Sequence, residues 1–203
     1  MTFEAEITKE LCAMTGKECI RDCLLDLRML CEPHEDFSLI ADKGWYRGGA
    51  ETYCLDFSVQ QHGASKRYII KALVAFSPGT APDFQLRSWM RRREHLERIG
   101  VPVCRLLGKG RGVFVEEFLD FAMNEWIVEI ENDKLRLLAL LTNLTEYCEA
   151  LARSGYNPIC ILPNFRVQNG VPLWVDFGSD LGDPIETQIA PEELLKKLKS
   201  EWS

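Results

Sequence analysis

Two strand-forming runs, TYCLDFSV (52–59) and RYIIKALVAF (67–76), are separated only by the short stretch QQHGASK. Both runs are rich in β-branched and aromatic residues, which favour extended structure. A connection this short joins antiparallel strands, because a parallel pair needs a crossover of roughly a dozen residues or more. The runs therefore predict an antiparallel sheet, and FSLIA (37–41) is expected to supply a third strand ahead of them.

In the rest of the chain the apolar residues recur with a helical period in some stretches and an extended period in others, and glycines and prolines mark the boundaries between them. Asn169-Gly170 between two apolar runs is a strong signal for a β-hairpin. The remaining predicted elements are one or two helices over 3–31, with Gly16 as the candidate break, a helix over 83–99, strands at 101–107 and 112–119, a helix over 134–155 closed by Gly155, and a helix over 191–202.

This order predicts an α+β protein with two lobes. The first lobe is expected to be a five-stranded antiparallel sheet with one inserted helix, and the second to be mostly helical. The expected boundaries are an N-terminal helical extension at 1–36, the sheet lobe at 37–119 and the helical lobe at 120–203. The extension would serve as a docking element or as a brace for the sheet.

The overall charge argues against a nucleic-acid-binding role. Lys and Arg number 24 and Asp and Glu 31, so the formal net charge is −7. Binding to phosphate backbones needs clustered basic side chains. The one basic run, Arg91 to Arg93, is interpreted as a solvated helix face.

The eight cysteines do not predict a zinc site or a disulfide scaffold. No CxxC motif occurs, and the nearest pair, Cys19 and Cys23, has no second pair to complete a tetrahedral site. The chain also begins without the basic and apolar regions of a secretion signal. No window approaches ~18 continuous apolar residues, so no membrane span is predicted. We expect a reducing cytoplasm and mostly buried free thiols.

Lys71 stands inside the apolar run YIIKALV and is the first candidate for chemistry. It would either face solvent at an edge of the sheet or line a cleft and hold phosphate oxygens. Glu94 on the following predicted helix could pair with it and orient it, and Glu97 is a rival for that role. Alternatively, Glu94 is an ordinary exposed glutamate.

Three glycines, Gly44, Gly48 and Gly49, lie between two predicted strands. Without Cβ atoms, such residues allow backbone N–H groups to approach phosphates, although hairpin loops need glycine in any case.

Asp176 follows the strand LWV and precedes Phe177 and Gly178. A carboxylate at the end of a strand can coordinate Mg²⁺. Asn164 begins the partner strand of the same hairpin, so the two oxygen ligands are expected to lie side by side. The alternative is that Asp176 is simply the polar end of a strand.

Taken in order, GWYRGG, YIIKALV, RRREHLERIGVPVCRLLG, VFVEEFL, ALARSGYNPICILPNFRV and LWVDFG resemble the signature parts of the protein-kinase-like fold. The resemblance covers roughly residues 37 to 182. Residues 94–107 are similar to the small bacterial kinase-like groups, namely aminoglycoside phosphotransferases, lipopolysaccharide kinases and RIO kinases. The resemblance implies binding of ATP and Mg²⁺, with Asn164 and Asp176 on the metal and the backbone from Glu116 through Phe118 to Leu119 receiving adenine.

The chain departs from the family pattern in its catalytic loop. Cys160 stands where the family has the aspartate that orients the substrate hydroxyl. A thiol with apolar neighbours is a poor replacement, because its ordinary pKa is about 8.5 and burial raises it. Asp180 or Asp183 is a weak substitute.

A second departure is the short stretch after Gly178, which leaves no room for the usual activation segment and later helices. The resemblance therefore implies a pseudokinase-like protein that binds nucleotide, transfers phosphate weakly or not at all, and acts through a protein partner. Two alternatives stay open. One is an active small kinase, an ATP-dependent phosphotransferase acting on a small molecule or a protein. The other is an unrelated α+β domain in which Asp-Phe-Gly is accidental.

Overall fold

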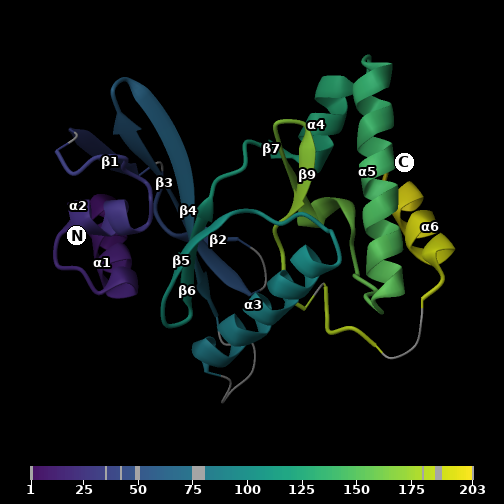
Figure 1. The fold of residues 1–203 in the computed structure, drawn as a ribbon, viewed down its shortest axis with the longest axis horizontal. Helices are drawn as coiled ribbons and strands as arrows, with labels where there is room; N and C mark the ends of the chain where they lie inside the picture. The colour runs from purple at the N-terminus through teal and green to yellow at the C-terminus, as the bar shows by residue number, and fades with distance from the viewer. Residues whose placement is uncertain are drawn as a thin grey trace. The chain divides into compact units, whose positions relative to one another are not determined.

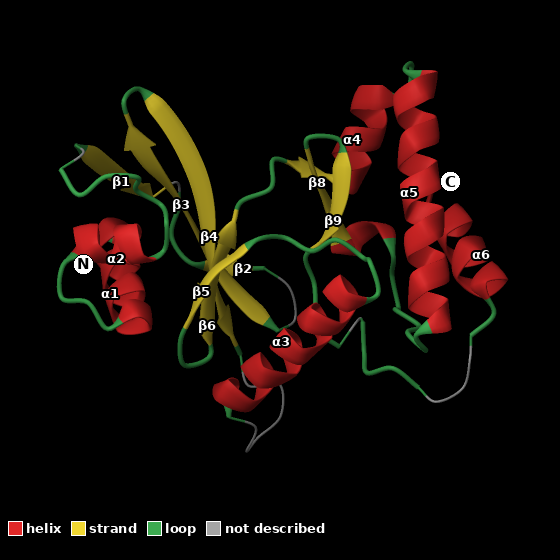
Figure 2. Cartoon of the chain, viewed as in Figure 1, coloured by secondary structure: helices red, strands yellow, loops and turns green. Residues whose placement is uncertain are grey.

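The protein is a mixed α+β chain with antiparallel sheets, as the sequence predicts (Figures 1 and 2). The computed structural model describes residues 2–34, 36–41, 43–48, 51–74, 81–179, 181–185 and 189–202. Within these ranges the chain folds into two compact units, and each is described by itself. The first unit contains residues 1–87 and 105–118, and the second contains residues 88–104 and 119–203.

The first unit is built on one antiparallel sheet with the strand order β1-β3-β4-β6-β5 and with β2 pairing with β3. The predicted five strands are therefore joined by a sixth, the two-residue β2. The strands are β1 (Phe37–Ala41), β2 (Tyr46–Arg47), β3 (Thr52–Gln61), β4 (Ala64–Leu73), β5 (Leu106–Lys109) and β6 (Val113–Glu117).

Two helices, α1 (Phe3–Thr15) and α2 (Ile20–Asp26), cover one face of this sheet (Figure 1). Gly16 ends α1 with φ 71°, in the left-handed region that glycine tolerates best. Apolar side chains of both helices share one core with the sheet residues Leu55, Phe57, Val59, Tyr68, Ile70 and Val115. The first helices and the sheet therefore stabilise one another by burying a common apolar surface.

The segment 101–107, predicted as one strand, is divided between the units. Val103 forms a parallel bridge with Trp174 in the second unit, while Leu106 begins β5 in the first. The helix α3 (Pro82–Arg98) is also shared, since the boundary falls between Arg87 and Ser88.

The second unit combines a small sheet, β7-β8-β9, with the remaining helices (Figure 2). Its central hairpin turns at Asn169 and Gly170, whose φ values of 52° and 80° are both positive, as a tight hairpin turn requires. The further elements are β7 (Phe121–Ala122), α4 (Met123–Ile130), α5 (Lys134–Arg153), the 3-10 turn η1 (Leu162–Asn164), β8 (Phe165–Gln168), β9 (Val171–Trp174) and α6 (Pro191–Trp202).

The stretch before α5, for which the sequence predicted no helix or strand, contains two elements. It forms β7 and α4, in which Met123 and Ile130 are buried. The Glu125 carboxylate accepts a hydrogen bond of 2.8 Å from the Ala122 N–H and so caps the helix start. The acidic residues obscured this short amphipathic helix.

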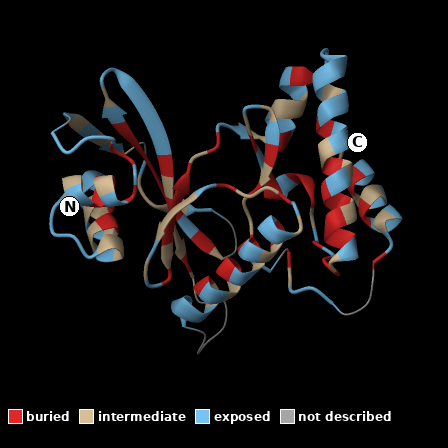
Figure 3. Ribbon diagram, viewed as in Figure 1, coloured by how far each residue is buried: buried red, intermediate tan, exposed pale blue. Residues whose placement is uncertain are grey.

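Most buried residues of α5 lie in the second half of the helix, while its first half is largely exposed (Figure 3). The ring of Tyr147 stacks at 5.9 Å from that of Phe165, which meets Trp174 edge to face at 4.9 Å. These contacts fix the β8–β9 hairpin against α5.

Among the described helices, none is both long and apolar enough to cross a membrane.

Candidate functional site

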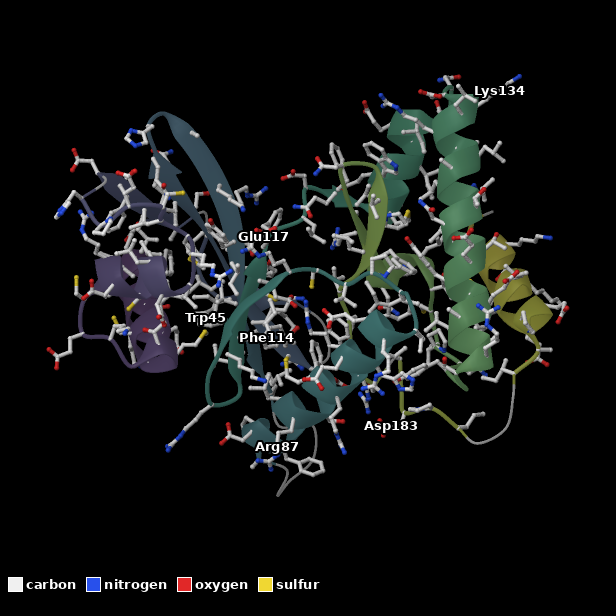
Figure 4. The ribbon with its side chains drawn as sticks, viewed as in Figure 1. Trp45, Arg87, Phe114, Glu117, Lys134 and Asp183 are labelled. Atoms are coloured by element: carbon white, nitrogen blue, oxygen red, sulfur yellow. The ribbon has the colours of Figure 1, made fainter. Side chains whose placement is uncertain are left out.

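Lys71 lies on β4 and forms an ion pair of 2.9 Å with Glu116 on the neighbouring strand β6. The Lys71 side chain is 13% exposed and that of Glu116 only 1%. Its ammonium also lies 5.8 Å from the ring centre of Phe114, which Figure 4 labels. Lys71 is therefore a largely buried cation rather than a solvent-facing edge residue.

Within the first unit, Lys71 pairs with Glu116, a partner that the sequence analysis did not consider. Glu116 pairs in register with Ile69, which lies two residues before Lys71 on β4. The side chains of Glu116 and Lys71 therefore project from the same face of the sheet. Glu94 lies on α3 and is exposed, as is Glu97. An ion pair between adjacent strands could have been considered, since VFVEEF and YIIKALV are both strand patterns.

The loop glycines are packed closely against side chains. A Cβ atom on Gly44 would meet the Phe3 ring at 2.5 Å, and one on Gly48 would clash with Cys54 Sγ and approach Thr52 Oγ1 at 3.0 Å. Gly48 also donates its N–H to the Thr52 carbonyl at 3.0 Å. These contacts give both glycines a packing role. Gly49 lies outside the described residues.

The segment expected to receive adenine is already bonded to its neighbours in the sheet. The Glu117 N–H donates to the Arg105 carbonyl, and the Phe118 N–H donates to that of Arg67, both at 3.1 Å. The Arg67 guanidinium lies 3.7 Å from the centre of the Phe118 ring. An adenine base could therefore hydrogen-bond only to polar groups of this segment other than the N–H groups of Glu117 and Phe118.

A second polar cluster shares the Lys71 face of the sheet. Asp56 is buried on β3, accepts a hydrogen bond of 2.8 Å from the Tyr46 hydroxyl and lies 3.6 Å from the Lys43 ammonium. Cys54 stands directly across from Lys71 in the β3–β4 register. Burial raises the pKa of the Cys54 thiol, and the nearby Lys71 charge opposes that rise. The thiol is therefore protonated at neutral pH.

In the second unit, the β8–β9 hairpin brings Asn164 and Asp176 together at its open end. Phe165 pairs with Trp174, and the Asn164 carbonyl accepts a hydrogen bond of 2.9 Å from the Val175 N–H. Asp176 is the next residue, half-buried, and its Oδ1 accepts from the Gly178 N–H at 2.8 Å. The hairpin thus places the two predicted metal ligands on adjacent strand ends.

Arg92 on α3 holds the segment that follows Asp176. Its Nη1 donates to the carbonyls of Phe177 at 2.9 Å and Gly178 at 2.8 Å, and its Nε donates to Asp183 at 3.0 Å. The hydrogen bond from Arg92 lowers the pKa of Asp183, which Figure 4 labels near α3. Asp183 is thereby held as a carboxylate beside a cation, and Asp180 lies outside the described residues.

Arg93 is buried and donates to the carbonyl of Cys104. Its guanidinium lies 5.7 Å from the centre of the Phe177 ring, which also meets Trp89 edge to face at 6.0 Å. The interpretation of the arginine run as a solvated face is therefore wrong for two of its three members. The face of α3 that carries Arg92 and Arg93 packs against the segment around Phe177. This contact joins residues far apart in sequence, so the local pattern did not reveal it.

The loop with Cys160 is fixed by the last helix, which sequence reasoning did not connect with it. The Glu201 carboxylate on α6 accepts hydrogen bonds from the N–H groups of Ile161, at 2.9 and 3.0 Å, and Leu162, at 2.7 Å. The half-buried Cys160 contributes its carbonyl, which accepts from Asn164 Nδ2 at 2.9 Å.

No protein-family model matches this chain, and no curated protein matches it in sequence. The described residues also contain no group of three or more His, Cys, Asp or Glu side chains placed to hold a metal ion. The residues around Lys71 belong to the first unit and those around Asp176 to the second, so each group stands on its own geometry.

Proposed function

We propose that this chain is a two-lobed, kinase-fold protein that binds a magnesium nucleotide and transfers phosphate weakly or not at all. The observation that carries the proposal is the open end of the β8–β9 hairpin, where Asn164 and Asp176 stand on adjacent strand ends. Amide and carboxylate oxygens are the ligands that Mg²⁺ prefers.

The donor set around the hairpin fits a magnesium ion. Asn164 uses its Nδ2 in a hydrogen bond to Cys160, which leaves the amide oxygen as the atom suited to a metal. Asp176 would supply a carboxylate oxygen. A bound Mg²⁺ supplies neutralisation of phosphate charge, which is much of catalysis in this class of reaction.

Lys71 is assigned the positioning of phosphate oxygens. Its ammonium is already paired with Glu116, so a nucleotide phosphate would compete with that carboxylate. The close packing of Gly44 and Gly48 also leaves less space for phosphates at the loop backbone. Both features support weak binding, and the thiol at position 160 supports the loss of transfer. The protein partner expected from the sequence stays a prediction.

A thermal-shift titration with ATP and Mg²⁺ tests the binding step. The melting temperature of the native protein should rise with nucleotide concentration. Asp176→Ala should abolish the rise, while Asp26→Ala, which changes an exposed aspartate on α2, should keep it. The absence of any shift with ATP, ADP or GTP would overturn the proposal.

A radiolabelled phosphate assay then tests the catalytic step. The native chain should show little or no incorporation, and Cys160→Asp should increase it if the loop otherwise has the geometry for transfer. Robust transfer by the native chain, lost in Cys160→Ser, would instead assign the thiol a catalytic role.

A further inference from the structure

Two thiols approach each other where α1 and α2 meet in the first unit. Cys12 Sγ lies 3.3 Å from Cys23 Sγ, and both cysteines are free. Cys12 is in the last turns of α1, and Cys23 is in the first turn of α2. A disulfide needs its sulfur atoms about 2.05 Å apart, so the two atoms would have to approach one another further to bond.

The surroundings hold the two sulfur atoms in place. Thr15 Oγ1, which donates to the Leu11 carbonyl at 2.8 Å, also lies 3.2 Å from Cys23 Sγ. Cys23 is fully buried in the core shared with the sheet, whereas Cys12 is half-exposed at its margin. The two thiols therefore differ in access, with Cys12 on the outside and Cys23 behind it.

We propose that Cys12 and Cys23 form a reversible disulfide that fastens α1 to α2. The oxidant is a small-molecule disulfide of the glutathione type. The Cys12 thiolate attacks one of its sulfur atoms and releases one thiolate, giving a mixed disulfide. The Cys23 thiolate then attacks Cys12 Sγ and releases the second thiolate. Two protons and two electrons leave the protein, and the small disulfide becomes two thiols.

Disulfide formation should be slow, because the surroundings of Cys12 disfavour its reactive thiolate form. Burial, followed by the contact with Cys23, raises the pKa of Cys12 to about 11, so little thiolate exists at neutral pH. The intramolecular second step is favoured by the 3.3 Å separation of the sulfur atoms. The disulfide should therefore accumulate under sustained oxidation rather than after a brief exposure.

Peptide mapping of the full chain tests the pairing directly. Trypsin cuts after Lys9, Lys17, Arg21 and Arg28, which places Cys12, Cys19 and Cys23 on three different peptides. After incubation with oxidised glutathione, the peptides 10–17 and 22–28 should appear as one species, two hydrogen masses lighter than their sum. Dithiothreitol should separate them again.

Variants and stability give a second readout. The oxidised native chain should melt roughly 5 °C or more above the reduced chain, because the cross-link restricts the unfolded state. Cys19→Ser should keep both the linked peptides and the shift, and Cys23→Ala should lose both. Linkage of Cys12 to Cys19 or Cys31, or only glutathione adducts after full oxidation, would overturn the proposal. The peptide map of the native chain decides the matter even if Cys23→Ala fails to fold.

Discussion

In the unit that contains Lys71, buried charges lie beside side chains of opposite charge, whereas in the unit that contains Asp176 they also bond directly to backbone groups. Lys71 pairs with Glu116, and Glu117 accepts from Lys66 at 2.7 Å and from Arg105 at 3.1 Å. All of these residues stand on or beside neighbouring strands, where register alone brings side chains together.

The second unit uses its charges to fix irregular backbone. Arg92 and Arg93 donate to carbonyl groups, and Glu201 accepts from the N–H groups at the start of η1. Each charge there satisfies backbone groups in a segment that has no strand or helix partner for them. Arg92 also pairs with Asp183 at 3.0 Å and Arg93 with Glu97 at 3.4 Å, but both of these carboxylates are largely exposed, so the contacts with backbone are the buried part of each interaction.

The largest expected effect comes from breaking the pair in the first unit. Lys71→Met should destabilise the chain by about 3 kcal/mol, because Glu116 loses its neighbouring cation while it stays buried. The double substitution Lys71→Met with Glu116→Leu should recover much of that loss. Urea unfolding of the native chain, the two single variants and the double variant measures the coupling free energy between the two side chains. Purely additive losses would show that Lys71 and Glu116 do not stabilise one another.

Arg93→Met should lower the free energy of unfolding by somewhat less, about 2 kcal/mol, because the Cys104 carbonyl loses its charged hydrogen-bond donor. The matched control is Arg91→Met in the same run, where an exposed side chain should change stability by less than about 0.5 kcal/mol. Equal effects of the two variants in urea unfolding would show that burial of Arg93 contributes nothing.

Glu201→Gln should lower the free energy of local opening of the Cys160 loop by about 1 kcal/mol, because an amide offers one acceptor oxygen to the Ile161 and Leu162 N–H groups in place of two. Hydrogen exchange at the Ile161 and Leu162 amides should become roughly fivefold faster. The control is Glu146→Gln on the exposed side of α5, for which the same two amides should exchange at the native rate.

The smallest effect concerns Asp183, whose side chain is 74% exposed. Arg92 lowers its pKa in the folded state, so the contact adds stability above the unfolded pKa and loses it as the pH falls through the folded pKa. Because solvent screens the pair, the contribution should stay below about 1 kcal/mol. Native and Asp183→Asn chains should therefore differ at about pH 6 and converge at about pH 2 in thermal unfolding.

The sequence by itself determined the elements whose signals are local. Gly16 ends α1 and Gly155, with φ 77°, follows the end of α5, because a residue without Cβ adopts the left-handed conformation easily. Asn169-Gly170 set the hairpin that brings Asn164 next to Asp176. In each case the deciding residues lie within a few positions of the feature, so the pattern can be recognised without the rest of the chain.

Only the tertiary structure decided which charges meet and what each buried group contacts. Glu116 stands beside Lys71, Arg92 donates to carbonyls beyond Asp176, and Glu201 bonds to the loop of Cys160. The run 101–107 was similarly divided, because one half pairs with β9 and the other with β6. These choices depend on groups that packing brings together from distant parts of the chain, and a local pattern carries no information about them.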